Sequence, residues 1–470
     1  MSASPRIDAV MTEVRRRIAA RILTPGAKLP SVRALAKALA VSTSTVVEAY
    51  ERLVAEGAIR SRPGSGFFVA STLAPLSLAD IGPKLDRQVD PFWVSRLALE
   101  GGQGLAMPGC GWLPPSWMPE EALRRALRTL SRANADVLMD YATPLGLPAL
   151  RQLLARRLAE TGLMVSADQI LLVDSGTQAI DMICRFLLEP GQTVLVDDPC
   201  YFNFHALLRA HRVKVVGVPY TAEGPDVALF EQALEEHRPR LYITNSAIHN
   251  PTGAVLSPVN AHRVLMLSER SGLTIIEDDI FADFEIAKAP RLAAFDALNR
   301  VIQIGSFSKT LSASARCGYI VTRKDWLDPL VDMKIASNFA GSQISEALVL
   351  AVLKDGSYRK HMEALKSRLT KAKGDVIQSL HLLGIEPWTH PRAGIFLWCR
   401  LPSGIDAAHM ARHALSENMV LAPGNVFSQS ESASNYMRFN VSQCDQPQFS
   451  AILRRAMTAA SCSTPKLLAF

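Results

Sequence analysis

Several features that would place this chain in a particular class of protein are missing from its sequence. Its seven cysteines are odd in number and scattered, with no CxxC spacing, so we expect free thiols in a reducing cytoplasm. The histidines lack ligand spacing, and no metal site is expected. No signal-peptide pattern opens the chain, and no apolar run approaches the roughly 18 residues that a membrane-spanning helix needs.

The positive charge of the chain is concentrated at one end. A length of 470 residues predicts two or three domains, and the net charge is +7. Residues 1–70 hold 11 Lys/Arg against 5 Asp/Glu, a net charge of +6. This is the charge distribution of a nucleic-acid-binding module attached to a nearly neutral body. A solvated basic helix is the alternative explanation of the charge alone.

The N-terminal residues have the pattern of a helix-turn-helix with a wing. Apolar residues recur at helical spacing from Ile7 to Ile22. Ser31 can cap a second helix, and Ser42 or Thr43 can cap a third one that stops at Gly57. The last two helices are joined by a tight turn, so the third can enter the major groove. Residues 58–69 then place two β-prone runs around a Pro-Gly-Ser-Gly turn, which predicts a hairpin wing.

This segment resembles the winged helix-turn-helix of GntR-family regulators over about residues 5–70. The resemblance is carried by Pro25–Ala36, by Val41-Ser42 and by the turn of the wing. The family often has arginine where this chain has Thr43, and a threonine cannot pair bidentately with guanine. Carried over position by position, the resemblance implies contacts to double-stranded DNA at Arg33, Ser42, Ser44, Thr45, Arg62 and Gly64. Helix capping is the alternative role of the three hydroxyl residues.

The rest of the chain has the pattern of an α/β fold. Residues 71–100 show no sustained period, so we expect a linker with one short helix at Phe92–Leu99, between domains of residues 1–70 and 101–470. Beyond it, apolar β-rich runs alternate with helical patterns, which predicts a mainly parallel sheet covered by helices. The predicted strands are Ile170–Val173, Thr193–Val196, Val213–Val218, Leu241–Thr244, Leu273–Ile276 and Val301–Ile304.

Polar residues at the ends of these strands match the chemical needs of pyridoxal 5'-phosphate (PLP). PLP requires a lysine for a Schiff base, an anion at its pyridine nitrogen, a phosphate cradle and an aromatic face. Lys309, in Gly-Ser-Phe-Ser-Lys-Thr, is the expected amine, and Asp278, after a predicted strand, is the expected anion. Backbone N–H groups at a helix start can receive the phosphate. The other expected cofactor contacts are Gly176, Thr177, Gln178, Ser306, Ser308, Arg316, Tyr201 and Asn250.

This ordered set resembles the fold-type I aminotransferases over about residues 105–470. The resemblance implies that Tyr141 reaches the phosphate of the partner subunit, that Arg438 pairs with a substrate carboxylate and that Gly394 lies beside the substrate. A fold-type I PLP domain with a smaller C-terminal subdomain is therefore expected. Relatives usually have a tyrosine two or three residues after the aspartate, where this chain has Ile280 and Phe281. The loss of that hydrogen-bond donor predicts altered Schiff-base tuning and weak catalysis.

The combination of the two resemblances is that of the MocR subfamily of bacterial regulators. It implies a homodimeric, cytoplasmic transcriptional regulator that binds DNA and responds to PLP or to an amino acid or amine effector. Two alternatives stay open from the sequence. One is a working aminotransferase that carries a secondary DNA-binding domain. The other is a plain repressor whose body has lost its cofactor.

Overall fold

The computed structural model describes residues 5–70, residue 99 and residues 104–462, apart from residues 20–21, 25 and 431. The chain divides into two compact units, one containing Met1–Leu85 and the other most of the remaining residues. Each unit is described separately below. The expected linker helix at Phe92–Leu99 lies outside the described residues, except for Leu99.

The N-terminal unit contains three helices followed by a hairpin, as the sequence predicts. Ser31 and Ser42 are the N-caps of the second and third helices, because their Oγ atoms accept hydrogen bonds from the backbone N–H groups of Ala34 and Thr45 at 3.2 and 3.1 Å. The two strands pair antiparallel. The elements are α1 (Pro5–Ala19), α2 (Val32–Ala38), α3 (Thr43–Ala55), β1 (Ile59–Arg62) and β2 (Gly66–Val69).

The apolar faces of these helices form a small core of their own. Val14 of α1 and Val46 and Tyr50 of α3 are buried in it, and the Tyr50 hydroxyl donates to the carbonyl of Pro30 at 2.9 Å. The prediction that Ile22 continues the apolar stripe of the first helix is wrong, since Ile22 lies outside α1 and is 59% exposed. The buried faces of α1 and α3 pack against each other.

The large unit is built on an eight-stranded sheet with the order β3-β10-β9-β8-β7-β4-β5-β6. Neighbouring strands from β4 through β7 and β8 to β9 are parallel, whereas β10 is antiparallel to β9 and β3. All six predicted strands are present, and β6 and β10 are additions. The strands are β3 (Ile170–Val173), β4 (Thr193–Asp198), β5 (Lys214–Thr221), β6 (Gly224–Pro225), β7 (Leu241–Thr244), β8 (Thr274–Asp278), β9 (Val301–Ser306) and β10 (Gly318–Val321).

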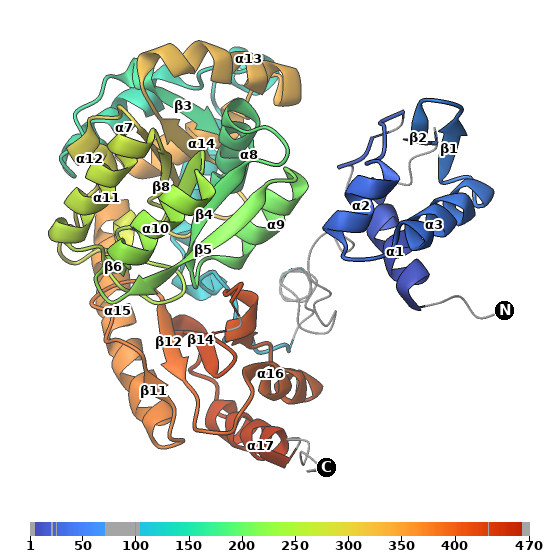
Figure 1. Ribbon diagram of the computed structural model, residues 1–470. Helices are drawn as coiled ribbons and strands as arrows, with labels where there is room; N and C mark the ends of the chain where they lie inside the picture. Colours follow the sequence, from blue (N-terminus) through green and yellow to red (C-terminus); the bar gives the residue numbers. More distant parts are fainter. Residues whose placement is uncertain are drawn as a thin grey trace. The chain divides into compact units, whose positions relative to one another are not determined.

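Helices cover this sheet (Figure 1). Helix α8 contacts β3, β9 and β10 and packs on α13, while α10, α11 and α12 form a second group. None of the helices in the described part of the chain is both long and apolar enough to cross a membrane. The helices are α5 (Glu120–Leu130), α6 (Ala135–Met139), α7 (Pro148–Ala159), α8 (Gly176–Leu187), α9 (Phe202–Ala210), α10 (Val227–His237), α11 (Pro258–Ser271), α12 (Leu292–Asp296), α13 (Leu327–Asn338), α14 (Gln343–Lys354) and α15 (Gly356–His381).

A second, antiparallel sheet forms the smaller C-terminal subdomain. Its strand order is β11-β12-β14-β13, and two helices that pack on each other accompany it. This confirms the expected fold class of an α/β domain with a smaller C-terminal part. The elements are β11 (Glu386–Pro387), β12 (Phe396–Arg400), α16 (Ala407–Ser416), β13 (Ala422–Pro423), β14 (Tyr436–Asn440) and α17 (Phe449–Cys462).

The register around β10 brings distant loops to one edge of the large sheet. Gly318 is opposite Ser306 of β9 on one side and opposite Val173 of β3 on the other. A Cβ at Gly318 would lie 2.9 Å from the Gly305 carbonyl oxygen and 3.0 Å from the Ser175 carbonyl carbon. Only glycine lets the backbone segments come this close. The loops that follow β3 and β9 therefore meet at this edge.

The end of β8 presents its carboxylates in alternating directions. Glu277 accepts hydrogen bonds from the N–H groups of Leu292 and Ala293 at 2.8 and 2.9 Å. Asp279 is bonded to the buried guanidinium of Arg291 at 2.8 Å. Asp278, between them, points into the cavity described below because successive side chains of a strand face opposite sides.

We expect Gly318→Ala to destabilise the protein by about 1–3 kcal/mol, because its new Cβ overlaps backbone that cannot move aside without separating the strands. Gly374→Ala is the matched control, since a Cβ there meets nothing within 4 Å inside α15. The control should be neutral or stabilising by roughly 0.5–1 kcal/mol, as alanine favours a helix over glycine. Urea unfolding measures both. Equal stability of the two variants would contradict the close approach at Gly318.

Candidate functional site

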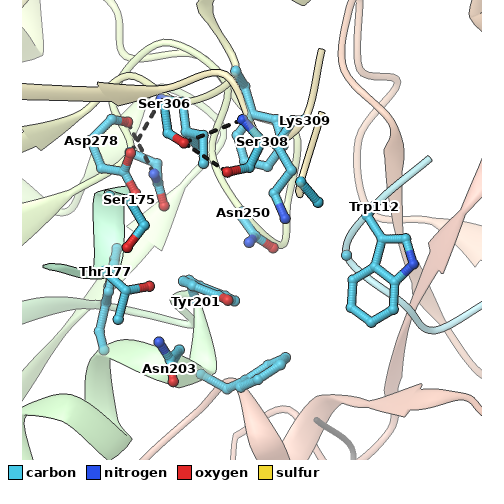
Figure 2. Close-up of a pocket in the computed structure, with 18 of the residues that line it drawn as sticks. Trp112, Ser175, Thr177, Tyr201, Asn203, Asn250, Asp278, Ser306, Ser308 and Lys309 are labelled. Carbon is cyan, nitrogen blue, oxygen red and sulfur yellow. Dashed lines mark hydrogen bonds between the residues drawn. The ribbon is translucent and has the colours of Figure 1, made fainter. Parts of the chain in front are cut away.

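A cavity of about 610 Å³ opens at the edge of the large sheet where the strand ends meet. Its walls come from the loops after β3, β7, β8 and β9, from the start of α9 and from β14. Figure 2 shows Ser175 and Thr177 on one side, Tyr201 below Asn250, and Trp112 across the cavity from Asp278. Most of the sequence-predicted site residues are thus brought together.

Lys309 reaches the cavity from the loop after β9. A Cβ at Gly111 would lie 3.9 Å from both the Lys309 Nζ atom and the Arg438 Nη2 atom, so the amine and the guanidinium converge. Burial lowers the pKa of Lys309 to about 8, and the nearby positive charges of Arg438 and Arg316 act in the same direction. A larger share of neutral amine makes Lys309 a better nucleophile toward a carbonyl group than an ordinary surface lysine.

Asp278 stands at the carboxyl end of β8, with its side chain buried. Burial raises its pKa to about 6, against the lowering effects of the Ile280 N–H bond, of Asn245 and of the charge on Lys309. Its Oδ1 accepts from the Ile280 N–H group at 3.2 Å, and Asn245 Nδ2 donates to its backbone carbonyl at 3.0 Å. A buried carboxylate held in this way favours a cationic partner such as a protonated ring nitrogen.

The start of α8 offers an anion cradle. Ser175 is the N-cap, and its Oγ accepts from the Gln178 N–H group at 3.1 Å. The N–H groups of Gly176 and Thr177 belong to the first turn, which no intrahelical carbonyl satisfies, and both residues line the cavity. Anions are stabilised at such a helix start.

Three further residues extend the cradle from β9 and the start of β10. Ser306 Oγ accepts from the Ser308 N–H group at 3.2 Å and lies 2.9 Å from Ser308 Oγ. Arg316, with a φ of 44°, lies two residues before the strand that separates β3 from β9, and it lines the same cavity. Hydroxyl, guanidinium and backbone N–H donors therefore line the same cavity.

Arg438 is a buried cation on β14, 1% exposed. It donates to the Asn250 Oδ1 atom at 2.9 Å and to the Gly109 carbonyl at 2.7 Å. Its guanidinium lies 4.2 Å from the centroid of the Phe396 ring. Burial lowers its pKa to about 10, and no carboxylate in the described part of the chain forms an ion pair with it. Its Nε atom has no hydrogen-bond partner among the described residues.

The sequence analysis missed the segment Gly109–Trp112, which forms one wall of the cavity. Asn440 Nδ2 fixes this segment by donating to the carbonyls of Cys110 and Trp112 at 3.1 and 2.7 Å. No local periodicity marks these residues, so only the fold reveals them. Asn245 was also missed, although its place directly after β7 follows the same strand-end rule as the other site residues.

The N-terminal unit presents a second candidate site on α2, α3 and the wing. Arg33, Arg62 and Gly64 are exposed, and the Arg62 guanidinium lies 4.7 Å from the centroid of the Phe68 ring. Ser42 Oγ contacts Ser44 Oγ at 2.8 Å and Thr45 Oγ1 at 2.7 Å. Capping is thus the observed role of Ser42, while contact with DNA stays a prediction for all six residues named above.

Some cations of the N-terminal unit form ion pairs with carboxylates, and others do not. Arg16 and Arg17 of α1 both pair with Glu13 at 2.7 Å, Arg15 pairs with Glu56, and Arg52 pairs with Glu48. The remaining cations near the candidate DNA face have no ion pair with any described carboxylate. These are Lys28, Arg33, Lys37, Arg60 and Arg62. The positive charge that is free to meet phosphate is therefore carried by α2, the loop before it and the wing.

Comparison with known proteins assigns both units. Residues 113–455 match the family model of class I and II aminotransferases. The chain belongs to the aminotransferase class I and II family. Residues 6–69 match the gntR family of bacterial regulatory proteins, so the whole chain has the MocR-type architecture of a GntR-type helix-turn-helix joined to an aminotransferase-like domain.

Similar proteins come from both groups. The chain is 29% identical to the uncharacterised HTH-type transcriptional regulator YdfD of Bacillus subtilis, covering 94% of this chain and 93% of the relative. It is 29% identical to YdcR of Escherichia coli, another such regulator, covering 91% and 93%. A crystal structure of the α-aminoadipate aminotransferase LysN of Thermus thermophilus, complexed with N-(5'-phosphopyridoxyl)-L-leucine, matches with a TM-score of 0.71 and 26% identity, covering 78% and 94%. PLP is the cofactor that this fold and family identify.

Three residues expected to contact ligands lie outside the lining of the cavity in this MocR-type chain. Tyr141 is 80% exposed and packs on the Phe339 ring, with a centroid distance of 4.9 Å. Gln178 Oε1 accepts from the Asp174 N–H group at 2.6 Å, so its side chain stabilises the turn. A Cβ at Gly394 would lie 2.8 Å from Ile248 Cγ2, so this glycine packs against protein.

Ile280 and Phe281 occupy the positions where relatives usually carry a tyrosine, and both line the cavity. Phe281 is 4% exposed, and its ring packs edge-on against that of Phe396 at a centroid distance of 5.6 Å. Neither side chain can donate a hydrogen bond. The cavity wall therefore lacks a hydrogen-bond donor at the two positions where relatives usually carry the tyrosine. Asn250, which also lines the cavity, has an amide group that can donate instead.

We expect the protein with PLP to absorb visible light, and borohydride reduction to fix the cofactor on the peptide that carries Lys309. Lys309→Ala should lose this absorption because no other amine lines the cavity in the described part of the chain. Lys373 is an internal control, since burial also lowers its pKa to about 8, but its amine donates to the carbonyls of Pro391 and Ala393. Peptide mapping decides between them. A label on Lys373 would refute the assignment of Lys309.

Proposed function

We propose that this MocR-type chain is a PLP-dependent transcriptional regulator whose large unit binds an amino acid or amine effector and whose N-terminal unit binds double-stranded DNA. The observation that carries the proposal is a cavity lined by a lysine, a buried carboxylate and anion-binding donors, in the same chain as a GntR-type domain with an unpaired cationic face. We place the regulator in the cytoplasm, as a homodimer. The ligand acts by binding two DNA-binding states with different affinity.

The cofactor would be held by residues that already converge. When bound, PLP supplies an electrophilic carbon to amines and an electron sink to what they carry. Lys309 provides the attaching amine and Asp278 the anion for the ring nitrogen. Gly176 and Thr177, with the hydroxyl and guanidinium donors of the cradle, receive the phosphate, while Tyr201 covers one face of the ring. The chemistry of this donor set fits PLP at each end of the cavity.

Arg438 is proposed to receive the carboxylate of the effector. Binding of a carboxylate to a buried guanidinium that has no anion partner is strongly favourable. Two parallel charge-assisted hydrogen bonds then replace unsatisfied donors. Its present bonds to Asn250 and to the Gly109 carbonyl connect the carboxylate position to the cofactor side of the cavity and to the Gly109–Trp112 wall.

The dimer is proposed from exposed side chains near Tyr141. Met139 and Tyr141 are 81% and 80% exposed, and Phe339 beside them is 59% exposed. Large apolar groups gathered in this way favour burial against another surface. A second copy of the chain would cover them and bring Tyr141 to the phosphate of the partner's cofactor. Tyr141 would then complete a site in which it has no part within its own chain.

A working aminotransferase is the second candidate. The family match and the intact Lys309 favour some amino-group transfer. The apolar side chains of Ile280 and Phe281 on the cavity wall argue against efficient turnover. The two relatives named above, which match more than 90% of the chain, are regulators. Rapid exchange of an amino group between an amino acid and a keto acid would favour this second candidate.

We expect Arg33→Ala and Arg62→Ala each to weaken DNA binding and to flatten the salt dependence by about one unit of slope, because each lost phosphate contact releases one counterion fewer. Arg16→Ala is the matched control: it removes the same charge from a residue that is paired with Glu13 on α1. Titration of full-length protein with duplex DNA at several salt concentrations gives the slopes. Slopes that stay at the wild-type value in both variants would exclude this face as the DNA contact.

We expect Arg438→Ala to lose about ten- to hundredfold in affinity for amino acids, as a charge-assisted hydrogen bond contributes about 1.5–3 kcal/mol. PLP should stay bound, because the anion cradle lies on α8, β9 and β10, and retained absorption also shows that the variant is folded. Arg359→Ala, an exposed arginine on α15, is the control. Spectral titration with amino acids and with simple amines measures the change. An unchanged response to amino acids would remove Arg438 from the effector site and point to an amine without a carboxylate, or to PLP itself.

A further inference from the structure

Val47 is an exposed apolar residue on the outward face of α3. It is 38% exposed, and Ile22 is the only other large apolar residue among the described residues of the N-terminal unit that is comparably open to solvent. Its neighbours along the helix, Val46, Ala49 and Tyr50, are buried in the core. Val47 therefore lies on the solvent-exposed flank of α3, beside the core-facing residues and about one turn after the N-terminus.

The outward face of α3 offers few ways to read bases through hydrogen bonds. The exposed residues at positions 43, 44, 47, 48 and 51 are Thr, Ser, Val, Glu and Glu, with no Arg, Lys, Asn or Gln among them. Glu48 is bonded to Arg52 at 2.5 Å. The bidentate pairings with guanine and adenine need the side chains that are missing here.

The hydroxyl groups at the start of α3 are engaged with one another. Ser42 Oγ accepts from the Thr45 N–H group and contacts the hydroxyls of both Ser44 and Thr45. Ser42 has one hydroxyl hydrogen, so it can donate to only one of them. The other hydroxyl must donate to Ser42 and keeps only an acceptor for a base. Val47, by contrast, is not engaged by any of these bonds.

The unpaired cations of α2 and the wing would position the outward face of α3 on DNA. Arg33 lies on α2, and Arg60 and Arg62 lie on the wing strand, so phosphate contacts from both elements would place α3 between them. In a helix-turn-helix, the N-terminal residues of the second helix then meet base edges in the major groove. Among the groups that those edges present, the C5-methyl of thymine is the one that favours an apolar partner.

We propose that Val47 is a specificity-determining residue that reads the C5-methyl group of a thymine in the major groove. This inference rests on the proposed DNA-binding function. It predicts that removal of a single methyl group from the DNA, with every hydrogen-bonding atom kept, weakens binding at the position that Val47 contacts. The effect should be about fourfold, as for one buried methyl-sized group.

The test uses the full-length, PLP-loaded protein and a duplex that it selects from a random-sequence pool. Each thymine of that duplex is replaced in turn by deoxyuridine, which lacks only the methyl group, and binding is followed by fluorescence anisotropy. Wild type should lose about fourfold at one position of a half-site. Val47→Ala should bind the thymine and deoxyuridine duplexes equally at that position, and Val47→Thr, which keeps one methyl group, should retain part of the difference.

The possible outcomes distinguish a failure of the methyl readout from a failure of the proposed DNA-binding function. Selective DNA binding that is insensitive to every deoxyuridine replacement overturns the methyl readout and leaves the regulator intact. Sensitivity that Val47→Ala retains at the same position assigns the readout to another residue and also overturns it. Failure to select any sequence overturns both the inference and the proposed function. Because Val47 is outside the core, its variants should fold, and circular dichroism checks this directly.

Discussion

The cofactor cavity depends on a close approach of backbone at Gly318. Strand β10 runs antiparallel between β3 and β9, so the start of one strand lies between the ends of two others. Hydrogen-bonded pairing fixes these positions closely, and the Ser175–Thr177 turn and the Ser306–Lys309 loop are held to one geometry. Arg316 lines the same cavity because it lies two residues before the start of β10. The anion site is thus built on paired strands and a capped helix, which makes it rigid before any ligand arrives.

The proposed effector end of the cavity is built differently, by contacts between the small antiparallel sheet and two loop segments of the large unit. Arg438 comes from the small antiparallel sheet, while Asn250 and the Gly109–Trp112 segment come from parts of the chain about 190 and 330 residues away. A ligand that competes for the bonds of Arg438 acts on this contact. The phosphate end is therefore suited to hold a cofactor, and the carboxylate end is suited to respond to a second ligand.

The sequence predicted the parts of the fold that local patterns determine. Strands β3 and β7 have the predicted bounds, and Asp278 and Ser306 were found because polar residues follow buried apolar runs. Strand β6 was missed because it has only two residues, and strand β10 was missed because it directly follows the cradle loop. The segment around Trp112 was missed because bonds from Asn440, 328 positions away, place it. The contact at Gly394 was expected from family position and that at Gln178 from its place at a predicted helix start, and both stay predictions. In the described structure neither residue lines the cavity, because Gln178 bonds to the Asp174 N–H group and Gly394 packs near Ile248.

The ion pairs on α1 affect how strongly the N-terminal unit binds DNA of arbitrary sequence. Glu13 and Glu56 pair with three of the four arginines of α1, so phosphate contacts of a single N-terminal unit fall mainly to the unpaired cations of α2, the loop before it and the wing. In the proposed dimer, stable occupancy then requires both units at once, and the second attachment is governed by its effective concentration rather than by its own affinity. On this proposal, a change in the spacing of the two units, with no change in either DNA-contacting surface, would be enough to change how much DNA is bound.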